Sequence, residues 1–146
     1  MKIIIVDDEK PARDRLNRLI AGMDEHQVVA EASNGHQAVE LTEKHEPDII
    51  LLDIRMPVMD GLEAARHISK NKNPPAIIFT TAFSDHALEA FETHAVDYLL
   101  KPVKIDRLQD AISSSKRLNR AQTGERLQDI GLNEVRNHIC ARVRGN

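Results

Sequence analysis

Four hydrophobic runs in the first hundred residues each end at residues that can do chemistry. The runs at 3–6, 49–52, 77–79 and 98–100 are followed by Asp7 and Asp8, by Asp53, by Thr80 and Thr81, and by Lys101. In an open parallel sheet the ligand site lies beyond the carboxyl ends of the strands, so we expect these side chains to converge. Three carboxylates, a hydroxyl and an ammonium could together bind a divalent cation, carry a phosphoryl group and sense its arrival.

The elements that would position these residues alternate between strand and helix patterns. Strands are expected at Lys2–Val6, Gln27–Ala32, Asp48–Leu52, Ala76–Thr80 and Val96–Leu100. Helices are expected to begin near Pro11, after Gly35, after Gly61, at Ser84 or Asp85, and near Ile105. Such alternation is typical of βαβ units and a parallel sheet. Five units joined by right-handed crossovers predict a doubly wound, flavodoxin-like (βα)5 α/β fold with strand order 2-1-3-4-5.

Composition and charge suggest one soluble domain followed by a different segment. Residues 1–116 carry 14 Lys and Arg against 20 Asp and Glu, whereas residues 117–146 carry six Arg against three acids. A basic tail of this kind can lie near nucleic acid, or it can be a solvated linker. No apolar run approaches the roughly 20 residues that span a bilayer, and we expect neither a membrane span nor a secretory leader. The single cysteine, Cys140, suits a reducing cytosol, so a cytoplasmic protein is expected.

Taken in order, these motifs resemble the receiver domain of two-component response regulators. The resemblance covers residues 1–118 and rests on Val6–Glu9, Leu52–Pro57 with Asp60–Gly61, Thr81–Ala82 and Asp97–Pro102. Residues 126–146 are similar to the approach to a LytTR-type DNA-binding domain, as in the regulator of alginate synthesis. Residues 119–146 are therefore interpreted as a linker and the beginning of a truncated output domain.

The resemblance implies a phosphoryl-accepting site that needs Mg²⁺. Asp53 would be the phospho-acceptor, and the donor would be a phosphohistidine on a sensor histidine kinase. Asp8 would bind Mg²⁺ directly and Asp7 through water, while Asp53 and the backbone carbonyl of Arg55 would complete the protein ligands. Mg²⁺ suits such a site because it prefers oxygen ligands and keeps several waters.

The resemblance also implies a lysine and two switch residues. Lys101 would pair with Asp53 or its phosphoryl group, and the Lys101–Pro102 bond would be cis. Thr81 would move toward the phosphoryl oxygens, and Tyr98 would rotate inward behind it. Strand alternation and the Thr-Ala motif favour Thr81 over the adjacent Thr80.

Each of these residues also has a purely structural interpretation. Asp53 could cap a turn, and Asp7 and Asp8 could stabilise the start of the first helix, where acids are favoured. Lys101 could be a surface lysine that ends a strand. Tyr98 could be a half-buried aromatic residue on an edge strand.

The expected output is a changed surface on the fourth helix, fifth strand and fifth helix, which could also mediate a homodimer. DNA would be contacted only through an output domain missing from this chain. The expected activity is limited to self-phosphorylation and slow self-dephosphorylation, with Arg55 and Phe83 beside the phosphoryl group. Two alternatives stay open: a stand-alone receiver that binds other proteins, and a Mg²⁺-dependent phosphohydrolase with an aspartate nucleophile. The second is disfavoured because Arg55 stands where such enzymes carry a second acid.

Overall fold

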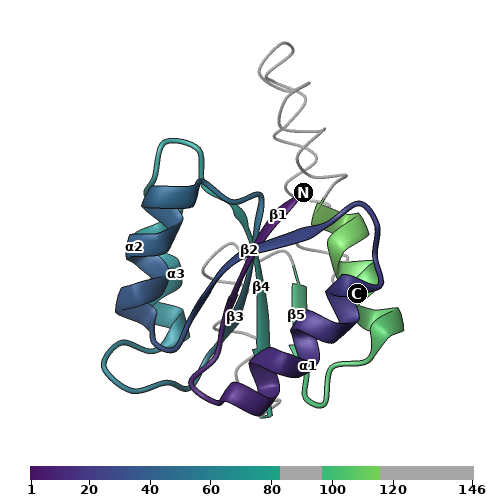
Figure 1. Cartoon of the computed structure of the whole chain (residues 1–146). Coiled ribbons are helices and arrows are strands. Elements are labelled where there is room, and N and C mark those ends of the chain that lie inside the picture. The colour runs from purple at the N-terminus through teal and green to yellow at the C-terminus, as the bar shows by residue number, and fades with distance from the viewer. Residues whose placement is uncertain (83–96, 116–146) are drawn as a thin grey trace, which may run out of the picture. The chain divides into compact units, whose positions relative to one another are not determined.

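The computed structural model describes residues 1–82 and 97–115, which lie in one compact unit, Met1–Ser115. Its strands form one parallel sheet in the order β2-β1-β3-β4-β5 (Figure 1). They are β1 (Lys2–Val6), β2 (Gln27–Ala32), β3 (Ile49–Asp53), β4 (Ala76–Thr81) and β5 (Asp97–Leu100). The helices are α1 (Lys10–Ala21), α2 (Gly35–His45) and α3 (Gly61–Ser69), with a further helix over residues 105–115. The predicted doubly wound fold and strand order are confirmed.

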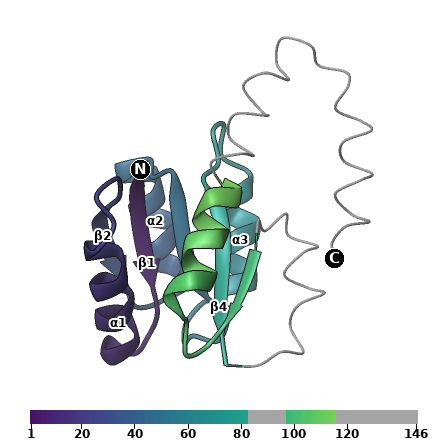
Figure 2. The same ribbon diagram turned by 90° about the vertical axis from the view of Figure 1, so that its right-hand side faces the viewer.

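Helices cover both faces of the sheet, so the central strands are buried on both sides. Figure 1 shows α2 and α3 on one face and α1 with the helix over 105–115 on the other, and Figure 2 shows the second pair from its own side. The side chains of β1 alternate between two cores: Ile4 and Val6 pack toward α2 and α3, while Ile3 and Ile5 pack toward α1. Burial on both faces explains why these strands are continuous aliphatic runs.

The edge position expected for the less apolar Gln27–Ala32 is also confirmed, because β2 pairs with β1 alone. Some boundaries differ by a residue from the prediction. Strand β3 includes Asp53 because the ladder continues to the pair Asp53 and Thr80, and β4 includes Thr81 because Thr81 pairs with Leu100 of β5. Asp53 and Thr81 therefore lie in the last positions of their strands, whereas Asp7, Asp8 and Lys101 come directly after β1 and β5.

Some expectations fall outside the described residues. These are the helix capped by Ser84 or Asp85, Phe83 and the segment 119–146. In the part of the chain that the structure describes, no helix is long and apolar enough to cross a membrane.

Candidate functional site

The three aspartates predicted to converge lie together at the carboxyl end of the sheet. One carboxylate oxygen from each of Asp7, Asp8 and Asp53 lies within 4.8 Å of the others. Asp7 and Asp8 follow β1, and Asp53 ends β3, which is the neighbour of β1. Asp7 is fully buried and Asp53 is 5% exposed, whereas Asp8 is exposed to solvent. The cluster is thus buried at Asp7 and Asp53 and open to solvent at Asp8.

Lys101 brings the matching positive charge from the end of β5. Its Nζ lies 2.7 Å from Asp7 Oδ2 and 3.5 Å from Asp53 Oδ2. Its backbone N–H donates to the Thr81 carbonyl at 2.8 Å, and the Lys101–Pro102 peptide bond is cis. Burial by itself would lower the pKa of the Lys101 ammonium, but the hydrogen bond to Asp7 and the charges of Asp53 and Asp7 outweigh it and raise this pKa. The lysine is therefore a fixed cation and not a surface residue.

Asp53 has an unusual electrostatic environment. Its pKa is raised from 3.8 to about 7, first by burial and then by the negative charges of Asp7 and Asp8, while Lys101 opposes the rise. One lysine thus cannot balance three acids in a site of low polarity. A bound cation would relieve the repulsion and favour the ionised form of Asp53.

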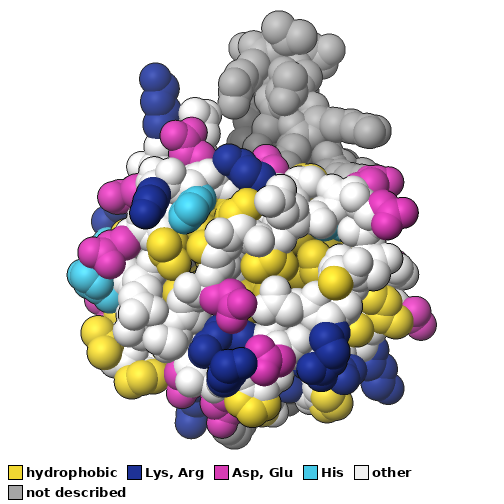
Figure 3. All heavy atoms as spheres, in the orientation of Figure 1, with side chains coloured by type: hydrophobic (Ala, Val, Ile, Leu, Met, Phe, Trp, Pro, Cys, Tyr) yellow, Lys and Arg dark blue, Asp and Glu magenta, His cyan; other side chains and the backbone are white. Residues whose placement is uncertain are grey.

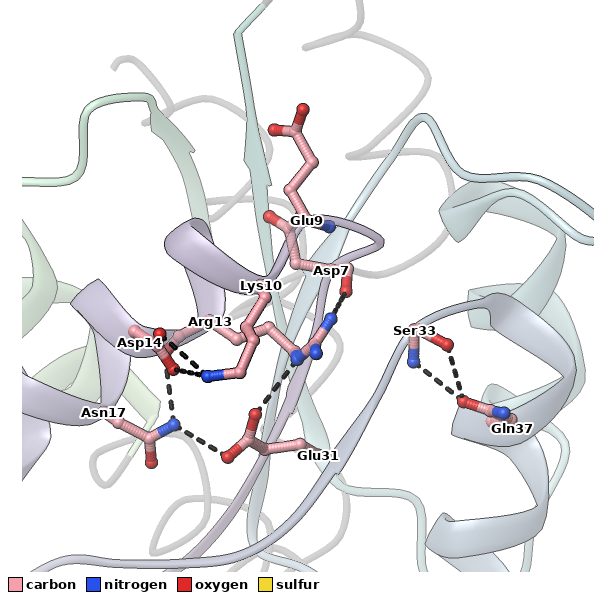
Figure 4. Close-up of polar contacts among 9 residues, drawn as sticks. All are labelled: Asp7, Glu9, Lys10, Arg13, Asp14, Asn17, Glu31, Ser33 and Gln37. Carbon is pink, nitrogen blue, oxygen red and sulfur yellow. Dashed lines mark hydrogen bonds and ion pairs between the residues drawn. The ribbon is translucent and has the colours of Figure 1, made fainter.

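Neither member of the acid pair caps helix α1. The N-cap residue is Glu9, whose side chain makes no capping hydrogen bond. Instead, Asp7 Oδ1 accepts a hydrogen bond from the Glu9 N–H at 2.9 Å (Figure 4). Both Asp7 oxygens are therefore engaged, one by this N–H and the other by Lys101. Asp8 keeps its exposed carboxylate available for a ligand.

The loop after β3 folds back against Asp53. The Gly61 N–H donates to the Ile54 carbonyl at 2.7 Å, and a Cβ at Gly61 would overlap the backbone carbonyl of Asp53. Asp60 caps α3 by accepting from the Glu63 N–H at 2.9 Å. The spacing of Asp60 and Gly61 after Asp53 therefore has a local cause: only glycine lets α3 begin this close to the strand end.

The two threonines at the end of β4 are both buried, but they differ in register. Strand alternation is expected to favour Thr81, but the ladder pairs Asp53 with Thr80. Alternation alone therefore does not single out Thr81. That choice rests on the Thr-Ala resemblance. The Thr80 hydroxyl has no hydrogen-bond partner among the described residues. Tyr98 on the edge strand β5 is half-buried and packs against the core on the side of α2 and α3.

The donor set fits a small hard cation. Three carboxylates supply oxygen ligands only, and the exposed side at Asp8 leaves room for the waters that Mg²⁺ retains. Arg55, whose backbone carbonyl is the fourth oxygen ligand that the resemblance implies, lies two residues after Asp53 in an exposed position.

Arg13 is a residue of the site region that sequence reasoning missed. Its Nη1 donates to the backbone carbonyl of Asp7 at 2.8 Å (Figure 4). A basic residue one turn into a helix that follows two acids could have drawn attention. Nothing in the sequence, however, says that its guanidinium folds back onto the chain.

Comparison with known proteins agrees with this geometry. The profile of the response regulator receiver domain matches residues 3–113. The positive alginate biosynthesis regulatory protein of Pseudomonas aeruginosa is 45% identical over 147 aligned residues, which cover 99% of this chain and 59% of that protein. The transcriptional regulatory protein BtsR of Salmonella typhi is 40% identical, with 90% of this chain and 52% of that protein covered. The chain thus spans just over half the length of these relatives.

Solved structures show the same relationship. The response regulatory domain of protein mrkE from Klebsiella pneumoniae superposes with a TM-score of 0.71 at 37% identity, covering 83% of this chain and 97% of that domain. The shared fold, the acid cluster and the match over residues 3–113 point the same way. This chain belongs to the response regulator receiver domain family.

Proposed function

We propose that this protein is a phosphorylation-controlled switch in which Asp53 accepts a phosphoryl group from a phosphohistidine of a sensor histidine kinase. The observation that supports this most is the cluster itself: three carboxylates within 4.8 Å of one another, with the Lys101 ammonium 3.5 Å from Asp53. A turnover phosphohydrolase fits less well because Arg55 stands where that class needs its second acid.

The transfer exchanges one bond to phosphorus for another. An oxygen of the ionised Asp53 carboxylate attacks phosphorus, the new O–P bond gives an acyl phosphate, and the N–P bond to the donor histidine breaks. The imidazole leaves with the electron pair of that bond. Lys101 is placed to hold a phosphoryl oxygen, because its Nζ already lies close to Asp53.

Asp7, Asp8, Asp53 and the backbone carbonyl of Arg55 would hold Mg²⁺. Bound there, the ion would offset negative charge on the carboxylates and on the incoming phosphoryl oxygens. The fully buried Asp7 has little freedom to move, so we assign it the water-mediated contact and the exposed Asp8 the direct one.

Downstream, we propose that Thr81 and Tyr98 couple the phosphoryl group to the surface around β5. Thr81 ends β4 next to Lys101, and Tyr98 lies half-buried on the edge strand. The output would be transcriptional, through a DNA-binding domain outside this chain, because similar proteins include a transcriptional regulatory protein. The segment 119–146 would connect to that domain, and the β5 surface could also pair two receivers.

The direct test is mass spectrometry after incubation with acetyl phosphate and Mg²⁺. Wild type should gain about 80 Da, the mass of a phosphoryl group, and Asp53→Asn should gain nothing because an amide cannot attack phosphorus. Asp24→Asn is the matched control, since Asp24 is an exposed acid in the turn after α1. Equal labelling of wild type and Asp53→Asn would refute the acceptor assignment.

A second test addresses the switch. Thr81→Ala should still be phosphorylated, but phosphorylation should change the environment of Tyr98 less than in wild type. Tyr98 is the single tyrosine of the chain. A lost hydrogen bond to a charged acceptor costs roughly 1.5–3 kcal/mol, which is comparable to the gap between two switch states. Thr80→Val controls for the neighbouring hydroxyl. A response at Tyr98 that survives in Thr81→Ala and is lost in Thr80→Val would move the role to Thr80.

A further inference from the structure

Arg13 joins the acid pair to the edge strand of the sheet. From α1 its Nη1 donates to the Asp7 carbonyl at 2.8 Å, and its Nε donates to Glu31 Oε1 of β2 at 3.0 Å. The Arg13 side chain is 18% exposed, so most of it is packed between these elements. Figure 4 shows the guanidinium placed between Asp7 and Glu31. One side chain thus fixes a backbone group of the site to a second strand.

Glu31 is itself held in place on both oxygens. Its Oε1 accepts from Arg13, and its Oε2 accepts from Asn17 Nδ2 at 2.9 Å. Asn17 also donates to the backbone carbonyl of Arg13 at 3.1 Å. The ladder pairs Glu31 with Ile5, whose side chain packs toward α1, so the carboxylate is on the α1 side of the sheet. The orientation of Arg13 is therefore determined by its neighbours.

This matters for Asp8, because its carboxylate has no hydrogen bond to another group in residues 1–82 or 97–115. Its position therefore follows from its backbone, and that backbone begins with the peptide unit between Asp7 and Asp8. On either side of Asp7, the N–H donates to the Ala32 carbonyl at 3.0 Å and the carbonyl accepts from Arg13. Arg13 thus holds the peptide before Asp8, while the Glu9 N–H of the peptide after Asp8 donates to Asp7 Oδ1 at 2.9 Å.

The same contact has an electrostatic disadvantage. A guanidinium beside the acid cluster repels any cation that binds there, and its ion pair with Glu31 offsets part of that repulsion. Figure 3 shows acidic and basic side chains intermixed over α1, so charge in this region is not uniformly negative. If Arg13 acts by positioning, removing it should weaken cation binding. If it acts only through its charge, removing it should strengthen cation binding.

The geometry points to Arg13 and Glu31 as a positioning pair that holds the Asp7–Asp8 peptide in the conformation that binds a divalent cation. This rests on the proposed function, because it assigns the pair a role at the same metal site. In this role the pair would contact neither the phosphoryl group nor the ion. It acts by keeping the Asp8 carboxylate where the ion needs it, as residues behind metal ligands commonly do.

The test is a Mg²⁺ titration of the full 146-residue chain, followed by NMR at the amides of Asp8 and Glu9. Arg13→Ala should weaken Mg²⁺ binding about 10-fold, the lower end of what removal of a supporting partner costs a metal site. Glu31→Ala should weaken it in the same direction, and the double variant should be no weaker than Arg13→Ala alone. Arg18→Ala is the matched control, because Arg18 is exposed on the same helix, and it should bind like wild type.

A second comparison separates positioning from charge. Glu31→Gln removes the negative charge but keeps an oxygen that Arg13 can donate to, so its affinity should stay within about twofold of wild type. If charge were the cause, Glu31→Gln and Glu31→Ala would bind equally weakly. Thermal unfolding in EDTA shows whether each variant is folded before Mg²⁺ is added. Should Arg13→Ala prove unfolded, the two Glu31 variants decide the question.

The outcomes separate this inference from the proposed function. Unchanged or tighter Mg²⁺ binding in Arg13→Ala, with wild type binding normally, would overturn the positioning role and leave the metal site intact. Wild type that does not respond to Mg²⁺ at all would remove the metal site, and the positioning pair with it.

Discussion

Replacing Asp53 by asparagine should stabilise the metal-free protein at neutral pH, although it destroys the proposed phosphorylation site. The pKa of Asp53 is raised from 3.8 to about 7, first by burial and then by Asp7 and Asp8. At neutral pH, folding therefore places a negative charge on Asp53 in the cluster, which costs free energy. The amide keeps the shape of the carboxyl group and removes that charge.

The size and sign of the effect follow from the pKa. A raised pKa means that the folded state binds the proton more tightly than the unfolded state, so stability falls as pH rises between the two values. A rise of about three pH units at about 1.4 kcal/mol each sets an upper limit of about 4 kcal/mol. The pKa of about 7 already includes the attraction of Lys101, 3.5 Å away, so we expect a gain of about 1–4 kcal/mol above pH 7. Below pH 4 the gain should vanish, because the carboxyl group is then neutral in both states.

The assay is urea unfolding in EDTA between pH 4 and pH 8, comparing wild type with Asp53→Asn and with the exposed control Asp24→Asn. The gain in free energy of unfolding of Asp53→Asn over wild type should grow through pH 4–7 and then level off. Added Mg²⁺ should stabilise wild type by mass action, by about 1.4 kcal/mol at ten times the dissociation constant, and so narrow the difference. A difference that does not change with pH, or a variant less stable than wild type at pH 8, would refute the reasoning about repulsion in the cluster.

Three further substitutions and one control, Gly22→Ala, test the packing around the site, each measured by urea unfolding. Thr80→Val should raise the free energy of unfolding by about 1 kcal/mol, because it removes a buried hydroxyl that lacks a partner among the described residues; a loss would mean that the hydroxyl has a partner. Gly61→Ala should lower it by about 2 kcal/mol, because its methyl group overlaps the Asp53 carbonyl. Gly22→Ala, where the added Cβ meets only an ordinary contact at 3.7 Å, should be tolerated. Val58→Gly should raise it by about 1 kcal/mol, since an exposed β-branched residue at φ 71° is strained, and a loss would show that the loop depends on the valine.

Much of the fold could be predicted because the sheet is buried on both faces. Burial of this kind makes β1 and β3 continuous aliphatic runs, and each run stops at a buried aspartate of the cluster, Asp7 after β1 and Asp53 at the end of β3. The order of the strands then follows from right-handed crossovers, which also bring Asp7, Asp8 and Asp53 together. Register was harder to predict, because the pairing of Asp53 with Thr80 depends on where the ladder ends rather than on any single residue.

What the sequence does not show is how the cluster is supported. Arg13 and Glu31 are 18 residues apart and belong to a helix and an edge strand, and their types are ordinary for solvated surfaces. Their pairing exists because β2 lies beside β1 in a register that puts Glu31 next to Ile5, on the α1 side. The same dependence on three dimensions holds for Asp53, whose pKa is set by burial and by two acids 45 and 46 positions away in the chain. The residues proposed to do chemistry can thus be found from their types and from the ends of strands, whereas the residues proposed to position them are seen only when the neighbouring strand is in place.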